Sequence, residues 1–493
     1  MRAGAELSKS LVTGERQTGC PKHLRKYVLA VAVLGSSLGF IDGTIITVAA
    51  QPIRTALGAS FGEVQWVVNA YTLTLSAFLL IGGAAGDRYG TRRVFAAGVA
   101  LFTLASVLCG VAPNVEALIA ARAVQGLGAA LMVPGSLALI AVNVPKAERG
   151  RAVGVWAAAS GVTSALGPLL GGLLIDLGSW RWIFFINVPV AALTLALLHA
   201  KVPADRGHAS GRFDGWGAAL AFVAVGAVAL GFTLAEAGGL TAPTALAALV
   251  AGTVAGALFL LHERRTASPM LPLGLFRARN FSVANGQTLL IYFALGGALF
   301  FLPVTLMSAH GWRAAEAGAV FLPFTVAMAI VSPLAGRVAD RIGHRAMLFA
   351  GPLVVAVAFL ALGAAAGVGD YFSAVVPAMA LFGVGMGLAI PSLSAVVLDG
   401  AGEDHAGIAS AVNNAVARVA GLLAVAALGL VASAVFAATL GEAGASFASR
   451  DGAAAADATI AAFQALCVVC AALAAAAAAL SPFLSRPAPA APA

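Results

Sequence analysis

The 493-residue chain is poor in charge, because Asp, Glu, Lys and Arg together make up only 10% of it. Soluble proteins carry about 25% charged residues. Hydrophobic residues make up 60%, and the mean hydropathy is +0.95. A chain of this length has too few charges to cover the several cores that a soluble fold would need. The composition therefore excludes a soluble enzyme and indicates a polytopic membrane protein.

Other common signatures are also missing. Four cysteines are too few for a disulfide framework, and Cys467 and Cys470 have no further Cys or His nearby to complete a metal site. No phosphate-binding G-x-x-x-x-G-K-[ST] motif occurs, and neither does a hydrolase G-x-S-x-G or H-E-x-x-H motif. We therefore expect no enzyme activity, no metal and no cofactor, and a proton gradient as the energy source in place of ATP.

Long apolar runs are what the sequence does contain. Fourteen of them, the first starting at Tyr27 and the last ending at Leu480, are long enough to cross a bilayer as helices. Continuous runs differ from the short alternating segments of a membrane β-barrel. The sequence therefore predicts an all-α polytopic membrane protein with 14 transmembrane helices.

The basic residues are unevenly distributed between the two sides of this topology. Most of the 29 Lys and Arg lie on the side of the N-terminus, and the opposite side holds only Arg54, Arg181, Arg313 and Arg450. This bias predicts that both termini are cytoplasmic and that the chain lies in the cell (inner) membrane. The basic residues then face the lipid bilayer, so no nucleic-acid partner is expected.

The chain also contains an internal repeat. The pattern G-x-x-x-D-R-x-G-x-R begins at Gly83 and again at Gly336, and a G-x-G pair followed by proline occurs at Gly126 and at Gly383 with nearly the same offset. The sequence therefore predicts a cytoplasmic tail (1–26), a six-helix half (27–200), a linker with two extra helices (201–281), a second six-helix half (282–481) and a cytoplasmic tail (482–493). Parallel halves of this kind suggest a secondary transporter with its site between them.

Several motifs together resemble the major facilitator superfamily, and specifically its fourteen-span drug:proton antiporter branch. They are the loop after the second span, an arginine motif in the fourth, a glycine motif in the fifth, a motif in the first, and a tryptophan-rich external turn: 83–93, Leu118–Gly128, Gly154–Gly172, Phe40–Ala49 and Ser179–Pro189. The resemblance implies the major facilitator fold, two six-helix halves plus two inserted helices, which work by alternating access.

Among the acidic residues, only Asp42 lies well inside a predicted span. A carboxylate at that depth is costly and indicates a functional site. Arg122 should lie at the same level, on a span that the resemblance implies is a neighbour, so we expect Asp42 and Arg122 to couple transport to protons. The alternatives are a structural Asp42 held by hydroxyl groups and a structural Arg122 bound to Gln125 or to backbone carbonyls.

Three further groups of residues are predicted to act in transport. The candidates for the substrate cavity are polar residues inside spans: Gln125, Gln287, Tyr292, Asn413, Asn414, Arg418 and Gln464. The candidates for cytoplasmic gating are the two repeated loops: Gly83, Asp87, Arg88, Gly90, Arg92 and Arg93, then Gly336, Asp340, Arg341, Gly343 and Arg345. The resemblance implies an antiporter helix built on Gly154, Gly167, Pro168, Gly171 and Gly172, for which helix packing alone is the alternative.

The favoured function is export of small, mostly hydrophobic compounds, such as drugs or antibiotics, in exchange for protons. The expected partners are a neutral or singly charged substrate, protons and lipid, joined by a periplasmic adaptor if the source is Gram-negative. A proton symporter or facilitator that imports a nutrient is the first alternative. A membrane-embedded receptor or enzyme is the second.

Overall fold

A computed structural model describes residues 21–203, 205, 214–266, 269–401, 406–442 and 444–484. Every regular element in these ranges is helical, which confirms the predicted all-α fold. Thirteen of the helices are long and apolar enough to cross a membrane, and α3, with 29 residues, completes a series of fourteen. The predictions for most of the two tails fall on residues 1–20 and 485–493, outside the described ranges.

The first six spans form one bundle, and the last of them has a break. The helices are α2 (Lys22–Leu57), α3 (Phe61–Tyr89), α4 (Thr91–Gly110), α5 (Val115–Asn143), α6 (Lys146–Leu177), the single turn α7 (Trp182–Phe185) and α8 (Asn187–Lys201). Two helices then form a hairpin: α9 (Gly215–Gly238) and α10 (Pro243–Arg265).

The last six spans form the second bundle after a short 3₁₀ turn, η1 (Leu273–Arg277). They are α11 (Arg279–His310), α12 (Ala314–Ala319) with α13 (Phe321–Ile342), α14 (His344–Val368), the π-turn η2 (Tyr371–Val375) with α15 (Val376–Ala401), α16 (Ala406–Leu440) and α17 (Ala453–Leu480), which ends in the 3₁₀ turn η4 (Ser481–Phe483).

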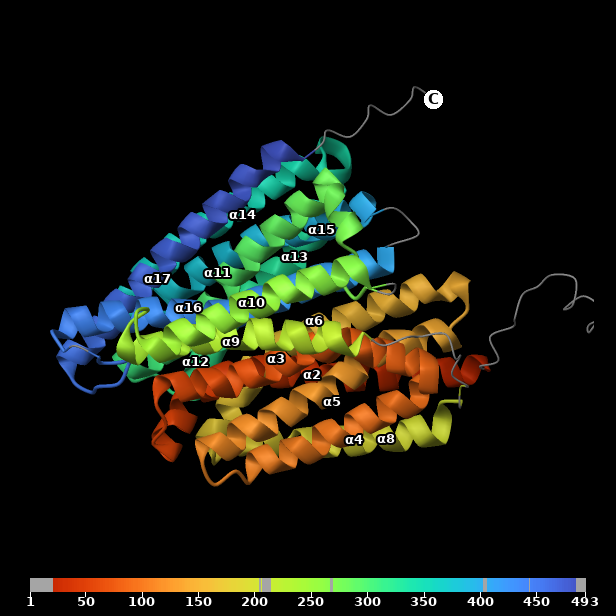
Figure 1. The fold of residues 1–493 in the computed structure, drawn as a ribbon, viewed down its shortest axis with the longest axis horizontal. Coiled ribbons are helices and arrows are strands. Elements are labelled where there is room, and N and C mark those ends of the chain that lie inside the picture. The colour runs from red at the N-terminus through yellow and green to blue at the C-terminus, as the bar shows by residue number, and fades with distance from the viewer. Residues whose placement is uncertain are drawn as a thin grey trace, which may run out of the picture.

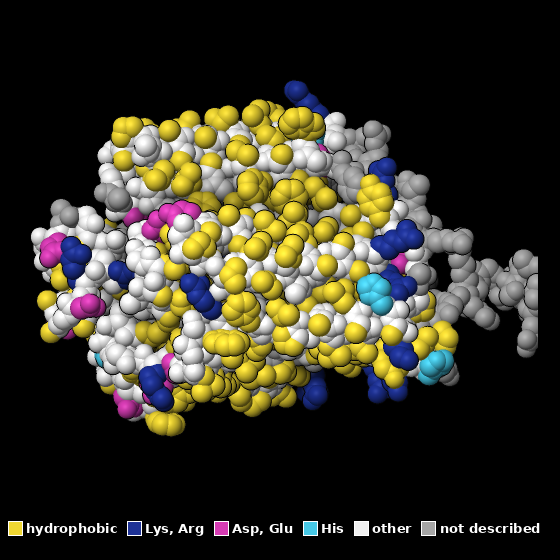
Figure 2. Space-filling view, turned by 90° about the horizontal axis from the view of Figure 1, so that it is seen from below, with side chains coloured by type: hydrophobic (Ala, Val, Ile, Leu, Met, Phe, Trp, Pro, Cys, Tyr) yellow, Lys and Arg dark blue, Asp and Glu magenta, His cyan; other side chains and the backbone are white. Residues whose placement is uncertain are grey.

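The two bundles converge at one end of the molecule and spread at the other (Figure 1). We call the spread end, where α2 begins and α17 ends, the tail face, and the opposite end the far face. The hairpin α9–α10 lies across the two bundles, with α9 packed on α3 and α16. A broad apolar band separates charged side chains that gather toward the two ends (Figure 2), as expected for a protein surrounded by lipid.

The repeat in the sequence reappears as repeated backbone geometry. Gly90, between α3 and α4, has φ 95° and ψ 127°, and Gly343, between α13 and α14, has φ 91° and ψ 146°. Residues other than glycine rarely adopt a positive φ of this kind, so the same turn requires glycine in both halves. Pro134 and Pro391 likewise lie inside the corresponding helices α5 and α15.

Close contact between helices in the first bundle depends on small residues. A Cβ atom at Gly126 on α5 would collide with the backbone carbonyl of Tyr71 on α3, and one at Gly128 would lie 2.5 Å from the backbone nitrogen of Phe102 on α4. Membrane helices associate through this kind of close packing because lipid supplies no hydrophobic drive. At Gly154 on α6, by contrast, a Cβ would meet nothing within 4 Å.

We predict that Gly126→Ala lowers the stability of the protein by about 1–3 kcal/mol, because the added methyl group pushes α5 away from α3. Gly154→Ala is the matched control and should leave stability unchanged or raise it by up to about 1 kcal/mol, as alanine is the better helix former. Thermal unfolding of the purified protein in detergent measures both. Equal melting temperatures for the two variants would contradict the packing described here.

Candidate functional site: a buried ion pair beside a central pocket

Asp42 and Arg122 form an ion pair that is completely buried, with both side chains 0% exposed. Asp42 lies on α2 and Arg122 on α5, and the Arg122 Nη1 atom donates to Asp42 Oδ2. The arginine is also fixed by Nε, which donates to the carbonyl oxygen of Val67 at 3.0 Å, and by the ring of Tyr71, 4.4 Å from its Cζ. The two residues singled out in the sequence are therefore brought together.

Amide side chains complete the shell around the carboxylate. Gln125 Nε2 donates to Asp42 Oδ1 at 2.8 Å, and Asn187 Nδ2 donates to the same oxygen at 3.2 Å. Both amides also donate to the hydroxyl of Ser106 on α4. Charge-assisted bonds of this kind make the burial of an ion pair tolerable. Four helices of the first bundle, α2, α4, α5 and α8, thus meet at this carboxylate.

One polar atom of the pair lacks a partner. Arg122 Nη2 is buried and donates no hydrogen bond to any of the described residues. A buried charged donor without a partner is costly, so the cluster holds Arg122 in place without fully satisfying it. Loss of the Asp42 charge would leave this arginine still less compensated.

A central pocket of about 360 Å³ lies between the two bundles. Its walls come from α2, α3, α6, α11, α13 and α16. They combine aromatic rings with hydroxyl groups: Phe300, Phe321 and Phe324, and Thr44, Thr47, Thr72, Ser164 and Thr325. A pocket of this size and mixed lining suits a small amphipathic molecule. Gly43 and Thr44, which follow Asp42 on α2, line the pocket directly.

Arg418 on α16 is the only charged residue among those that line the central pocket. Its Nε atom has no hydrogen-bond partner among the described residues. The ionisable groups that act on it are the hydroxyl groups of Tyr71 and Tyr292, and none of the described acids forms an ion pair with it. The pocket therefore presents a cation that is free to meet a ligand.

The other predicted cavity residues do not line this pocket. Gln125 belongs to the Asp42 cluster, Gln287 donates to Leu348 O, Ala477 O and Ser481 Oγ inside the second bundle, and Tyr292 packs on the apolar cluster around Phe281. Asn413 bonds Asn285 and Thr288, whereas Asn414 and Gln464 are exposed. The part that these six residues play in a substrate cavity therefore stays a prediction. The sequence places a polar residue in a span, but helix rotation decides which way it faces.

Asn69 on α3 is the pocket residue that sequence reasoning missed. It is 1% exposed, it lines the central pocket, and neither its Oδ1 nor its Nδ2 atom has a hydrogen-bond partner in the described part of the chain. A buried amide with both groups unsatisfied is costly unless a ligand or water fills the site. An amide in the middle of an apolar run was the signal that could have identified it.

The glycines of α6 pack closely on their neighbours, two within the first bundle and one against the second bundle toward the far face. Gly167 and Gly171 pack on α2, where added Cβ atoms would collide with Thr44 and Ile45, and Gly172 packs on the Ala314 carbonyl of α12. Gly318 of α12 in turn packs on the carbonyl of Pro168. Close helix contact is therefore seen at three of the four predicted glycines, and not at Gly154.

Further contacts close the far face. Asp176 at the end of α6 accepts from the backbone nitrogens of Ala314 and Ala315 at 3.2 and 3.0 Å, so it caps a helix of the other bundle. Phe61 of α3 stacks on rings from the second bundle: Phe300, Phe301 and Phe447. These contacts hold the two bundles together at the end opposite the termini.

The predicted gating loops lie at the spread tail face. Asp205 accepts from the backbone nitrogens of Thr91 and Arg92 at 2.6 and 3.0 Å, and Arg92 Nη2 donates to the carbonyl of His199. Arg92 therefore bonds its own side of the molecule and not the second bundle. The side chains of Asp87 and Asp340 lie outside the described part of the structure, while Arg88, Arg93 and Arg341 are exposed and Gly83, Gly336 and Arg345 are half-buried.

A half-buried carboxylate on the hairpin joins α9 to both bundles. Glu236, near the far end of α9, accepts from Gln65 Nε2 of α3 at 2.7 Å and from Ser433 Oγ of α16 at 3.5 Å. Gly429 leaves it room, since a Cβ there would lie 2.5 Å from Glu236 Oε1. The sequence indicated Asp42 alone as a carboxylate deep in a span. Glu236 lies so close to a helix end that the sequence placed it at the edge of its predicted span.

Comparisons with known proteins agree with this architecture. The family model described as Major Facilitator Superfamily matches residues 32–425. The chain belongs to the major facilitator superfamily. It is 35% identical to the multidrug resistance protein Stp of Mycobacterium tuberculosis over 83% of this chain and 76% of that protein.

Two further relatives have similar sequence identities to this chain. The chain is 34% identical to the methylenomycin A resistance protein of Bacillus subtilis over 82% of this chain and 87% of that one. It is also 34% identical to the tetracenomycin C resistance and export protein of Streptomyces glaucescens over 82% and 75%. These relatives confirm the predicted family and the association with drug and antibiotic resistance. The chain is a multi-pass membrane transporter of small substrates.

Solved structures show the same fold. A bacterial homologue of the human lysosomal transporter Spinster, inward-facing and unoccupied, superposes with a TM-score of 0.67 at 17% identity over 95% of this chain and all of that one. A peptide transporter mutant with bound sulfate superposes with a TM-score of 0.65 at 15% identity, over 95% and 96% of the two chains. At these identities the likeness concerns the major facilitator fold alone.

We predict that Arg122→Leu lowers stability by about 3–5 kcal/mol, because it leaves the Asp42 carboxylate buried without its cation. Adding Asp42→Asn to the same chain should recover part of the loss, since the second substitution removes the uncompensated charge. Thermal unfolding of the single and double variants in detergent tests this. Additive losses would show that the two side chains do not interact energetically.

Proposed function

We propose that this transporter exports small amphipathic compounds, such as antibiotics, from the cytoplasm in exchange for protons. The tail face is then cytoplasmic and the far face external. The observation that carries the proposal is the buried Asp42–Arg122 pair on the helix α2, whose next residues line the central pocket. Relatives named for multidrug resistance and for tetracenomycin C export support the substrate class.

The coupling step follows from the electrostatics of the pair. A proton that reaches Asp42 removes the negative charge, so the attraction to Arg122 and the two charge-assisted amide bonds weaken together. The ionisable groups around this carboxylate are Arg122, Tyr71 and Cys109. Release of Asp42 frees α2 to shift against α5. Gly43 and Thr44 move with α2, so the shape of the central pocket changes with protonation.

Alternating access requires one face of the transporter to be closed while the other is open. The far face is closed in this structure by Asp176 on α12, by the α6 glycines and by the Phe61 aromatic cluster. The repeated loops at the tail face do not bridge the bundles through Arg92. The conformation therefore corresponds to an inward-facing state, and the outward-facing state requires the far contacts to break while the basic loops approach each other.

Arg418 makes the pocket selective for substrates that carry hydrogen-bond acceptors. A guanidinium in a low-dielectric pocket attracts carbonyl and carboxylate oxygens and repels cations. Asn69 offers a donor and an acceptor on the facing wall. The favoured substrates are thus neutral or singly anionic compounds with an aromatic or other apolar body, a narrower class than composition alone suggests.

We predict that Arg418→Ala lowers export of acceptor-bearing compounds by about tenfold, the order expected when a charge-assisted hydrogen bond is lost. Export of a permanent cation such as ethidium should be unchanged or improved. Thr439→Ala is the matched control, because Thr439 is exposed near the far end of the same helix and its hydroxyl group donates to Val435 O. Equal losses for both compound types would argue against recognition by Arg418.

Expression in a drug-sensitive bacterium tests the function as a whole. Cells that produce the wild-type chain should accumulate less of a lipophilic antibiotic than cells with an empty vector, and a protonophore should abolish the difference. Unchanged accumulation across a panel of antibiotics, with the protein present in the membrane, would exclude the exporter function.

A further inference from the structure

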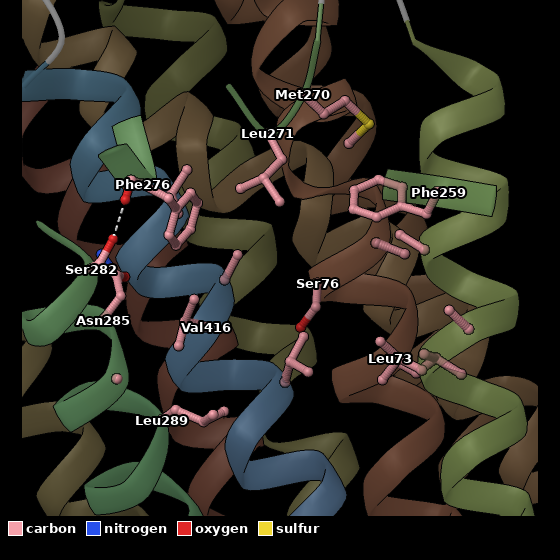
Figure 3. Close-up of a pocket in the computed structure, with 18 residues that line it drawn as sticks. Leu73, Ser76, Phe259, Met270, Leu271, Phe276, Ser282, Asn285, Leu289 and Val416 are labelled. Atoms are coloured by element: carbon pink, nitrogen blue, oxygen red, sulfur yellow. Dashed lines mark hydrogen bonds between the residues drawn. The ribbon is translucent and has the colours of Figure 1, made fainter. Parts of the chain in front are cut away.

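A second pocket, of about 530 Å³, lies between the hairpin and the two bundles. We call it the hairpin pocket. It is bounded by α3, α9, α10, α11 and α16 and by the linker before α11. In the close-up, Leu73 and Ser76 on α3 face Val416 on α16 across it, with Leu289 on α11 below (Figure 3). None of its lining residues belongs to α2, α5 or α6, so it is separate from the central pocket.

The lining is suited to an uncharged lipophilic ligand. Of the described residues that line the pocket, none is charged, and the polar side chains are Ser76, Ser282 and Asn285. Asn285 is bonded to Phe281 O and Asn413, and Ser282 donates to Phe276 O. Ser76 Oγ is buried and has no hydrogen-bond partner within the residues that the structure describes. The pocket thus offers apolar walls and one unsatisfied hydroxyl group, the usual pattern for a site that orients a drug-sized molecule.

The pocket is closed toward the tail face and accessible from the side. Met270, Leu271 and Phe276 of the linker cover its tail end, and Glu263 Oε2 holds that cover by accepting from Leu271 N at 2.8 Å. Among the described elements, α10 packs extensively against α9 alone. The side of the pocket between α10 and α11 is therefore not closed by helix packing. Leu289 of α11 lines the pocket and is 43% exposed. The route in is therefore lateral, from the lipid around the transmembrane part.

Only a thin partition separates the two pockets. Val419 of α16 lines the hairpin pocket, whereas Arg418 and Leu422 line the central one. Leu73, from the hairpin pocket, and Leu422, from the central pocket, pack in one apolar cluster with Ala229 of α9. A separation of α3 from α16 by one side chain's width would join the pockets, and the joined path would be apolar until it reaches Arg418.

We propose that the hairpin pocket is an uptake site, which takes an uncharged lipophilic substrate from the membrane leaflet at the tail face and holds it before it passes between α3 and α16. This inference rests on the proposed export function and assigns a role to the inserted hairpin: α9 and α10 build the outer wall of the site. Ser76 orients the substrate through its free hydroxyl group.

Binding of N-phenyl-1-naphthylamine, an uncharged lipophilic probe with one N–H donor, tests the site. Energy transfer from tryptophan to the probe is measured with the full-length protein in nanodiscs, and empty nanodiscs give the background. Ala221→Phe on α9 fills the pocket and should weaken binding by about tenfold or more. Ser76→Ala should weaken it by about threefold to tenfold.

Ala219→Phe is the matched control, because Ala219 is exposed on the same helix outside the pocket and should leave probe binding unchanged. Probe export from cells should fall with binding in Ala221→Phe but not in Ala219→Phe. Unchanged affinity in Ala221→Phe overturns the uptake site even if wild-type export is intact, so the outcome is distinct from failure of the export function. Loss of a copurified phospholipid in Ala221→Phe, with probe affinity unchanged, would show a lipid acyl-chain site and also overturn it.

Discussion

The transporter is organised around an ion pair that cannot leave the membrane interior. Asp42 and Arg122 are both completely buried, and an isolated charge in such surroundings costs several kcal/mol or more. Neither residue can therefore change its charge alone without disturbing the other. Four helices contribute to the shell of the pair, so a change at Asp42 reaches most of the first bundle. This constraint is what makes the site suitable for coupling a proton to a movement of helices.

The remaining features place that movement where it affects a substrate. Gly43 and Thr44 join the ion pair to the central pocket along one helix, and Gly167 lets α6 lie against the same stretch of α2. The α6 glycines thus serve the far-face seal as well as packing within their own bundle, which fits both interpretations that the sequence left open. The hairpin α9–α10 adds a pocket on the outside of the seam and a half-buried carboxylate, Glu236, at its far end.

Much of this organisation can be read from the sequence, because membrane insertion imposes strong rules on composition. The length of the apolar runs predicted the spans, and the repeated loop motif predicted the two halves. The rarity of charged residues inside spans indicated Asp42, Arg122 and Arg418 as candidates. The faces of the helices were harder to assign. Gln125, Gln287, Asn414 and Asn69 are all polar amide residues inside spans. Of these four, only Asn69 lines the central pocket. Rotation about a helix axis depends on packing with neighbours that are distant in sequence, which a nearly uniform apolar pattern does not encode.

The central claim is that protons drive transport through Asp42, and everted membrane vesicles test it most directly. Substrate accumulation is measured with and without an imposed pH gradient, acid inside, for the wild type, Asp42→Asn and Glu236→Gln, the last being a half-buried carboxylate outside the ion pair. The account predicts that the gradient drives accumulation in the wild type and in Glu236→Gln, and that Asp42→Asn loses this response while still binding substrate. Full gradient-driven accumulation in Asp42→Asn would contradict it.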